Sequence, residues 1–321
     1  MKISRRIALI FCVALSLPAY SQTGPYPNKP VKFVVPFAPG GGSDTFARQI
    51  AQKLNENYGY TIVIDNKPGA GGNLGAEAAL REPADGYTLL VISGSYAGNA
   101  IVRKPAFDPA TAIQPIIQFT REPIVLVGGP TTSFKSLGEL VDKARKEPGS
   151  IAYGTSGVGG LAHLSTEYFA SVAGIKLNHI PYKGTSASLV DLAGGQIQFI
   201  LGGSSSIAPL VKGGKVRALA VAMSARLQSM PDVPTFAEQG FGGFQADLWH
   251  GLVAPKGVPT KVVTKLNADI NAVLRNPEIA ANLATVDVIA AGGTPQQFGA
   301  VIRADMERWK TIVQKTGIKI D

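Results

Sequence analysis

The chain has 321 residues, of which 45% are hydrophobic and only 17% are charged. This balance excludes an intrinsically disordered protein, because disorder goes with low hydrophobicity and high charge. Lys and Arg outnumber Asp and Glu by 31 to 22, which gives a net charge of +9. The basic residues are scattered, without runs and without interleaved aromatic residues, so we expect no nucleic-acid partner.

The N-terminus has the pattern of a secretory signal peptide. Lys2, Arg5 and Arg6 precede an apolar run at residues 7–17, and a small-x-small cleavage signal follows and ends at Ser21. We predict that residues 1–21 are removed, which takes away three positive charges and leaves a mature chain of 300 residues with a charge of +6. No other stretch approaches the roughly 20 apolar residues that span a bilayer, so we expect a soluble, exported protein.

The only cysteine, Cys12, lies inside this leader. The mature chain is therefore expected to have neither a disulfide nor a thiol nucleophile. Lipidation at Cys12 is an alternative, but the bulky Phe11 before it fits poorly and Ser21 is the better cleavage point. Arg5 and Arg6 leave twin-arginine export open as a second route.

In chain order, apolar runs of strand length alternate with segments of helical periodicity. The predicted strands are residues 31–36, 61–64, 87–92, 113–119, 124–127, 151–153, 178–181, 198–201 and 216–221. The predicted helices cover residues 44–57, 72–80, 137–146 and 161–172, and two more in the tail carry Val262 to Ile270 and Phe298 to Ile312. We interpret residues 120–123 as a break between two separate strands.

Strand–helix alternation of this kind predicts an α/β fold with parallel sheet. Three hundred residues usually divide into more than one domain, and the alternation starts again in the middle of the chain. We therefore predict two lobes, joined by crossings that include the proline-marked segment 231–234. Lobe 1 is expected to contain residues 22–121 and 235–321, and lobe 2 residues 122–234.

The sequence offers little for catalysis. Its three histidines are far apart, and it has no metal-binding motif, no G-x-S-x-G turn and no Walker A sequence. We expect no enzyme activity, no metal and no cofactor. One alternative stays open, because residues 157–162 fit G-x-G-x-x-A and could hold a nucleotide or phosphate, although the acidic residue expected about 20 positions later is missing.

Two glycine-rich loops each join a predicted strand to a predicted helix, one at residues 36–44 and one at residues 153–160. Free N–H groups at a helix N-terminus attract anions, and glycines let a ligand approach the backbone closely. One such loop in each lobe would suit a small carboxylate held between the lobes. Candidate polar contacts are Ser43, Thr155 and Ser156, while Asp44 is favoured as a helix cap but is retained as a site candidate.

Several segments of the chain carry a family signature. They are Tyr26–Pro30, Val34–Gly41, Asn66–Gly72, Ala84–Leu89, His179–Gly184, Val216–Val221, Pro231–Phe236 and Gly292–Pro295. In sequence and order they resemble the Bug-type periplasmic solute receptors of tripartite tricarboxylate transporters. The resemblance covers essentially the whole mature chain.

This resemblance implies a two-lobed type II periplasmic-binding-protein fold with hinge crossover strands and a ligand in the cleft between the lobes. It implies a monomer in the periplasm that passes a small organic carboxylate to membrane permease subunits. In such receptors the loop corresponding to residues 37–44 grips a ligand carboxylate, often through ordered water, and residues 155–157 contribute from the other lobe. The predicted ligand-binding residues are Phe37, Ala38, Gly41, Ser43, Asp44, Ser93, Thr155, Ser156, Gly157, His163, Gly203 and Ser204.

One departure from the family pattern concerns ligand choice. Many relatives carry an Asp-Asn pair where this chain has Gly202 and Gly203, followed by three serines. Without that acid a ligand ammonium has no obvious counter-charge, so we expect a simple carboxylate rather than an amino acid. The glycines leave room for a longer dicarboxylate or an aromatic acid. A sensor that reports its bound ligand to a signalling partner remains an alternative.

Overall fold

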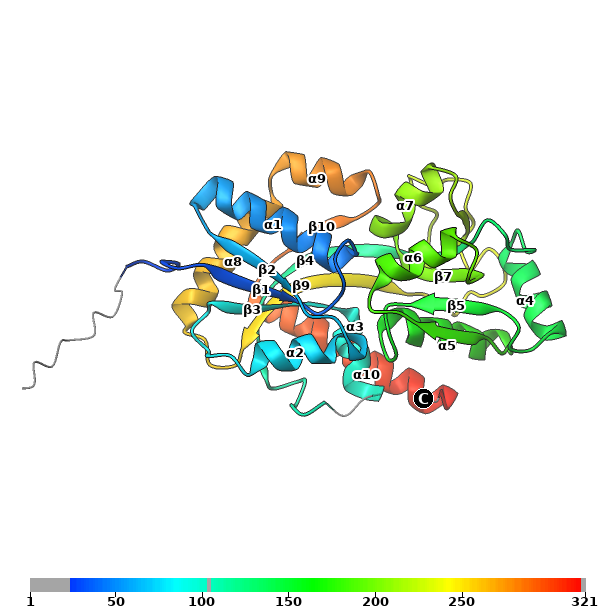
Figure 1. Ribbon diagram of the computed structural model, residues 1–321, viewed down its shortest axis with the longest axis horizontal. Coiled ribbons are helices and arrows are strands. Elements are labelled where there is room, and N and C mark those ends of the chain that lie inside the picture. Colours follow the sequence, from blue (N-terminus) through cyan, green and yellow to red (C-terminus); the bar gives the residue numbers. More distant parts are fainter. Residues whose placement is uncertain (1–23, 103–104, 319–321) are drawn as a thin grey trace, which may run out of the picture.

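The computed structural model describes residues 24–102 and 105–318. The predicted signal peptide and Cys12 lie outside the described residues. The described chain forms two α/β lobes side by side (Figure 1), as the sequence predicts.

The sheet of the first lobe combines parallel and antiparallel strands. Its order is β2 (Ile62–Asn66), β1 (Val31–Val35), β3 (Thr88–Ser93), β9 (Asp247–Pro255) and β4 (Ile113–Gly128), with β10 (Ile289–Gly292) also paired to β4. The first three strands are parallel, and β9 runs antiparallel to both of its neighbours. We did not predict β9 or β10, because we assigned a mainly helical tail.

Helices cover both faces of this sheet. They are α1 (Gly42–Tyr58), α2 (Asn73–Leu80), α3 (Gly94–Val102), α8 (Thr260–Leu274), α9 (Pro277–Ala284) and α10 (Pro295–Thr316). Alternate side chains of β1 enter different cores, since Phe33 packs with the α1 and α8 side while Val34 belongs to the opposite core. A strand buried on both faces reads as a continuous apolar run, which is why β1 was predictable.

The second lobe has its own, smaller sheet. It contains β5 (Ala152–Thr155), β6 (Asn178–Pro181), β7 (Phe199–Gly203) and β8 (Arg217–Val221), joined by the C-terminal part of β4. Its helices are α4 (Leu137–Lys146), α5 (Leu161–Ala173), α6 (Thr185–Ala193) and α7 (Ser204–Lys212). Our sequence reading did not assign α3, α6 or α7, which are short and rich in glycine, serine or alanine.

Strand β4 is the crossing between the lobes, and here our prediction of two strands was wrong. Residues 113–123 pair with β9 in the first sheet, and residues 124–128 pair with β7 in the second. Pro123 does not end the strand, although it lacks an N–H group, because it lies opposite Asp247 of β9 and the next residue, Ile124, pairs with Gly203 of β7. The chain returns between Val221 and Asp247. The lobe boundaries at 121/122 and 234/235 stay a prediction.

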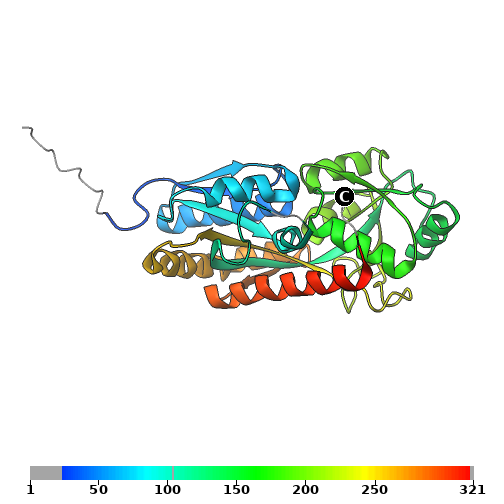
Figure 2. The same cartoon turned by 90° about the horizontal axis from the view of Figure 1, so that it is seen from below.

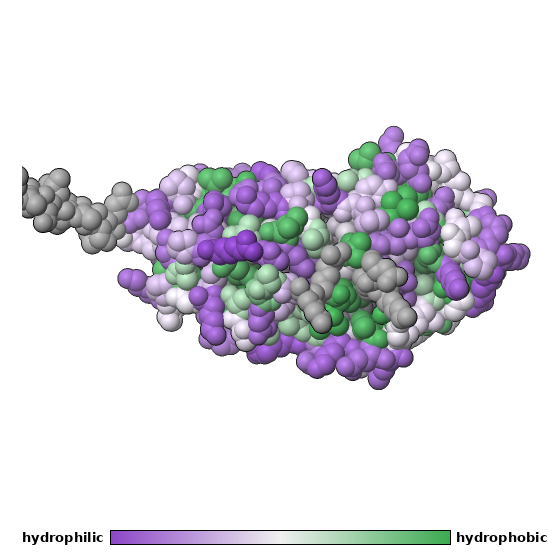
Figure 3. Space-filling view, turned by 60° about the horizontal axis from the view of Figure 1, so that its bottom comes forward, coloured by the Kyte–Doolittle hydropathy of each residue, from purple (hydrophilic) through white to green (hydrophobic). Residues whose placement is uncertain are grey.

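The last helix also connects the lobes. In Figure 2, α10 runs as a long red helix along one side of the molecule and reaches the second lobe, where it contacts α5. The face in Figure 3 is largely hydrophilic toward its ends, with hydrophobic residues gathered in smaller patches. Within the described residues no helix is long and apolar enough to cross a membrane.

Candidate ligand-binding site

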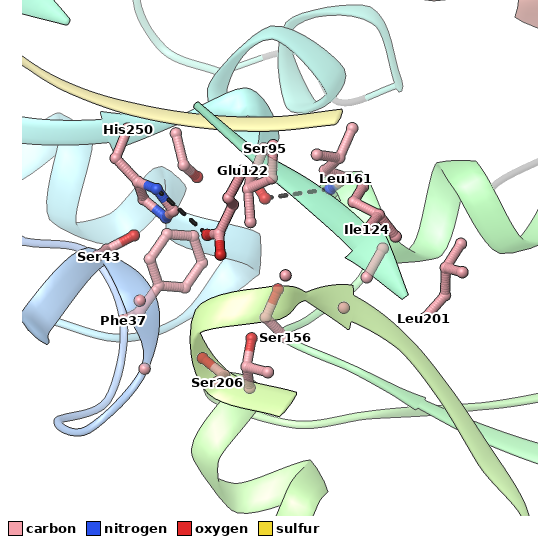
Figure 4. A pocket seen from close by; sticks show the side chains of 18 residues that line it. Phe37, Ser43, Ser95, Glu122, Ile124, Ser156, Leu161, Leu201, Ser206 and His250 are labelled. Atoms are coloured by element: carbon pink, nitrogen blue, oxygen red, sulfur yellow. Dashed lines mark hydrogen bonds and ion pairs between the residues drawn. The ribbon is translucent and has the colours of Figure 1, made fainter. Parts of the chain in front are cut away.

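A pocket lies between the two lobes, and the space in and in front of it, open solvent included, is about 580 Å³. From the first lobe and the crossing strands it is lined by Phe37, Gly41, Gly42, Ser43, Ser93, Ser95, Glu122, Ile124, Leu248 and His250. From the second lobe it is lined by Ser156, Leu161, Ala162, Thr185, Leu201, Gly202, Gly203 and Ser206. Figure 4 shows the labelled side chains gathered around this space.

Half of the predicted site residues line this pocket. They are Phe37, Gly41, Ser43, Ser93, Ser156 and Gly203. The remaining six do not line it, and they are Ala38, Asp44, Thr155, Gly157, His163 and Ser204. Whether any of these residues contacts a ligand stays a prediction.

Helix N-termini face the pocket from both lobes. The N-caps of α1, α5 and α7 are Gly41, Gly160 and Gly203, which have no side chain to cap the helix. In α5 and α7 one first-turn N–H group, of Leu161 and of Ser205, donates instead to Ser95 Oγ and to Glu122 Oε2. The first N–H groups of a helix have no partner within the helix, and they carry partial positive charge. The pocket can therefore stabilise an anion through neutral groups, and the serine hydroxyls around it add further donors.

Asp44 supports the α1 loop from outside the pocket. Its carboxylate accepts hydrogen bonds from the Gly40 N–H at 3.0 Å, from Arg48 Nε at 2.9 Å and from Asn66 Nδ2 at 2.9 Å. Burial opposes ionisation of this side chain, but the hydrogen bonds from Arg48, Gly40 and Asn66 outweigh it and lower the pKa of Asp44. With both oxygens engaged, Asp44 fixes the shape of the loop, but our expectation that it is the helix cap was wrong, because the N-cap of α1 is Gly41 and Asp44 lies in the first turn.

Thr155 and His163 hold the second glycine loop in the same way. Thr155 Oγ1 accepts from the Gly157 N–H at 3.2 Å and lies 2.7 Å from His179 Nε2. His163 Nδ1 accepts from the Gly159 N–H at 3.1 Å, and its ring stacks on that of His179. Burial lowers the pKa of His179 to about 4. The buried His163 and the half-buried His179 therefore position the loop backbone, and Ser156 is the side chain of this loop that lines the pocket.

Gly157 serves the contact between the lobes. Its φ of 134° is one that side chains rarely adopt, and a Cβ there would approach the backbone of Gly71 to 3.1 Å. The loop that resembles a dinucleotide motif is thus packed against the first lobe.

Further hydrogen bonds join the loop before α1 to the second lobe. The Ala38 N–H donates to the Lys183 carbonyl at 3.1 Å, and Ser186 Oγ donates to the Pro39 carbonyl at 2.9 Å. On the other side of the pocket the Leu161 N–H donates to Ser95 Oγ at 3.1 Å. Ala38 is therefore a lobe-to-lobe contact, and the structure has the two lobes closed on each other.

The sequence reading missed two buried titratable residues in the pocket, Glu122 and His250. Glu122 is 1% exposed and projects from β4 into the pocket, where its Oε1 lies 3.6 Å from His250 Nδ1 (Figure 4). Burial raises the pKa of Glu122 to about 7 and lowers the pKa of His250 to about 3. Near pH 7 His250 is therefore uncharged and Glu122 is only partly ionised, so the two side chains do not form a strong ion pair.

Glu122 also corrects our expectation about the missing acid. A Cβ on Gly203 would lie 2.6 Å from Glu122 Cδ, so the glycine is what makes room for this carboxyl group. The pocket does contain an acid beside residues 202 and 203, but β4 supplies it. The premise that no acid lies near residues 202 and 203 was therefore wrong, whereas the expectation of a simple carboxylate rather than an amino acid stays a prediction.

The pocket shows no sign of a metal centre. Among the described residues no group of three or more His, Cys, Asp or Glu side chains could hold a metal ion. The chemistry available is hydrogen bonding by serine hydroxyls, backbone N–H groups and one carboxyl group.

Comparison with protein families identifies the family of this chain. Residues 46–318 match the model of the tripartite tricarboxylate transporter family receptor. The chain belongs to this receptor family. The receptor is also 33% identical to Protein BugT of Bordetella pertussis over 325 residues, which covers 100% of both chains.

Solved structures agree with the receptor fold. R. palustris Rpa4515 with adipate is 36% identical, with a TM-score of 0.88 over 92% of this receptor and 99% of that chain. MatC from Rhodopseudomonas palustris with bound malate is 30% identical, with a TM-score of 0.86 over 90% of this receptor and 100% of that chain. The two-lobed periplasmic-binding-protein fold is confirmed. A solute-binding role in transport is confirmed with it, and the nucleotide-binding enzyme is not favoured.

Proposed function

We propose that this receptor is exported to the periplasm by cleavage of residues 1–21 and there binds an aliphatic dicarboxylate between its lobes as a monomer. It then presents the closed, loaded form to the membrane subunits of a tripartite tricarboxylate transporter. It has no catalytic step of its own.

The observation that carries this proposal is the pocket between the lobes, which the N-termini of α1 and α7 face with glycine N-caps. Neutral donors of this kind bind carboxylates while leaving the ligand free to dissociate, because they supply no full opposite charge. The likeness to proteins solved with adipate and malate supports the same ligand class. Ser43 and Ser93 from lobe 1 and Ser156 from lobe 2 are the proposed side-chain contacts.

A thermal-shift screen of refolded, ligand-stripped protein tests the proposal. The panel should contain adipate, malate, aspartate, benzoate and ATP at equal concentration. A ligand at 100 times its dissociation constant stabilises the fold by about 2.7 kcal/mol. Adipate and malate should therefore raise the melting temperature most. Stabilisation by ATP but by none of the acids would contradict the proposed function.

A further inference from the structure

The packing of β4 against β7 positions the Glu122 side chain in the pocket. Its side chain leaves β4 next to Ile124, which pairs with Gly203 of β7. The missing side chain at position 203 provides the space for the carboxyl group, because a Cβ there would lie 2.7 Å from each carboxyl oxygen. A carboxyl group on one strand and a glycine on its neighbour thus fit each other at the start of α7.

The two oxygens of this carboxyl group have different environments. Oε2 accepts a hydrogen bond from the Ser205 N–H in the first turn of α7 at 2.9 Å. Oε1 is buried and has no hydrogen-bond partner anywhere in the described chain. A buried polar atom without a partner is costly, and this one belongs to a residue that lines the pocket. The geometry therefore leaves one oxygen available to a ligand.

The groups that face Glu122 do not neutralise a negative charge on it. From β9 the titratable group beside Glu122 is His250, whose low pKa keeps it uncharged, and its Nδ1 lies 3.3 Å from Thr120 Oγ1. From α7 the facing groups are the Ser205 N–H and the buried hydroxyls of Ser204 and Ser205. Neither α1 nor α5 brings a charged side chain to the pocket lining, and no Lys or Arg of residues 24–102 and 105–318 lines it.

We propose that Glu122 is a specificity-determining residue that binds in its neutral form, donating its Oε1–H to a carboxylate oxygen of the bound acid. This rests on the proposed function, because it requires a carboxylate ligand. An ionised Glu122 would repel a dicarboxylate in a pocket that lacks cationic side chains. Binding therefore takes up a proton wherever free Glu122 is ionised, and the affinity depends on pH.

The direction of this dependence follows from linkage. Burial raises the pKa of Glu122 to about 7, whereas aliphatic carboxyl groups in water titrate near 4 to 5 and are ionised throughout the range above 6. The dicarboxylate keeps its charge between pH 6.5 and 8.5, while Glu122 loses its proton. The dissociation constant should increase on the order of tenfold over this interval.

Isothermal titration with adipate, or with malate if adipate does not stabilise the protein, tests this inference at pH 6.5, 7.5 and 8.5. Wild type should bind progressively more weakly as pH rises and should take up protons at pH 7.5 when two buffers of different ionisation enthalpy are compared. Glu122→Gln can accept from the Ser205 N–H through its oxygen and present its NH₂ to the ligand at every pH. Its affinity should therefore be nearly flat with pH and exceed that of wild type at pH 8.5.

Glu167→Gln is the matched control, because Glu167 is another partly buried carboxyl group with a raised pKa, and it bonds to Tyr153 outside the pocket. This variant should keep the wild-type pH dependence. The amide signal of Ser205 should titrate near pH 7 in ligand-free wild type and not in Glu122→Gln.

Three results would overturn the inference. The first is flat wild-type binding, or a pH dependence that persists in Glu122→Gln. The second is that aspartate binds more tightly than adipate and malate as pH rises, because an ionised Glu122 would then act as the counter-charge of the aspartate ammonium group. In these two cases the receptor function survives. Failure of both dicarboxylates to bind at pH 6.5 would overturn the proposed function and this inference together.

Discussion

At the residue scale, the carboxyl group of Glu122 fills the space that a side chain at position 203 would need. The glycine lies at the end of β7 as the N-cap of α7, with an ordinary extended backbone. Its requirement is therefore steric and not conformational, since any residue can adopt that φ. What excludes a larger side chain is the carboxyl group of Glu122.

We expect Gly203→Ala to weaken ligand binding by about tenfold or more, because the added methyl group would displace a buried hydrogen-bonded carboxyl group worth roughly 1–3 kcal/mol. Titration calorimetry with the dicarboxylate measures this loss. Gly243→Ala is a suitable control, because a Cβ at position 243 meets nothing within 4 Å. Gly203→Ala should also lower the stability of the ligand-free protein through this clash, and the double variant Gly203→Ala/Glu122→Ala should recover part of that stability. Equal binding by Gly203→Ala and wild type would mean that Glu122 has no defined place in the pocket.

At the element scale, the N-terminus of α1 combines an open approach with a firmly held loop. Gly41 lines the pocket, has an extended backbone with φ of −84°, and leaves empty space where a Cβ would stand. Asp44, Arg48 and Asn66 hold the loop through their hydrogen bonds. The helix can therefore tolerate a side chain at position 41, whereas the proposed binding of a ligand at this N-terminus requires the space to stay open.

Gly41→Phe should lower dicarboxylate affinity by about 100-fold or more, because the ring would fill the space in front of the N–H groups that we propose bind the anion. Gly41→Ala should have a much smaller effect. The unfolding temperature of both ligand-free variants should stay within a few degrees of wild type, which circular dichroism can check. Normal binding by Gly41→Phe would place the ligand elsewhere.

At the scale of the whole molecule, the buried pair of Glu122 and His250 links stability to pH. The pKa of Glu122 is raised from 4.5 to about 7, so its contribution to stability is lost as pH rises through that range. The pKa of His250 is lowered from 6.5 to about 3, so its contribution is lost as pH falls through that range. The two residues together favour maximal stability between about pH 4.5 and 6.5.

Glu122→Gln should consequently stabilise the ligand-free protein at pH 8 relative to pH 5. The difference should be on the order of 3 kcal/mol, since each pKa unit corresponds to about 1.4 kcal/mol. Urea unfolding of wild type and Glu122→Gln at pH 5 and pH 8 measures it, and comparing the two pH values cancels the cost of the new amide. A stability difference that does not change with pH would show that Glu122 stays protonated or ionised throughout.

Much of the fold was predictable from local patterns. Strands β1 and β3 are continuous apolar runs, and α4 has the bounds that its apolar spacing indicated, Leu137–Lys146. Both glycine loops stand where the chain passes from strand to helix. The two-lobed fold and the carboxylate receptor role came from the family resemblance added to these patterns.

The elements that escaped prediction depend on tertiary contacts. Strand β9 contains Trp249, His250 and Gly251 in a tail that otherwise favours helix, and it forms because it lies between β3 and β4. The proline in β4 indicated a break, yet pairing with β9 carries the strand through both lobes. Local propensity is a weak guide where the partner strand is far away in sequence.

The pocket likewise combines residues that local sequence predicts with residues that only tertiary contacts bring together. Its serines and glycines could be predicted as parts of strand-to-helix loops, because a local motif places each of them. Glu122 and His250 could not, since they lie 128 residues apart and meet only because β4 and β9 pair through the crossing between the lobes. Sequence alone, with the family resemblance, thus determined the solute-receptor class and the position of the two glycine loops. Only the tertiary structure decided that the acid comes from β4, because burial and the space left by Gly203 are properties of packing.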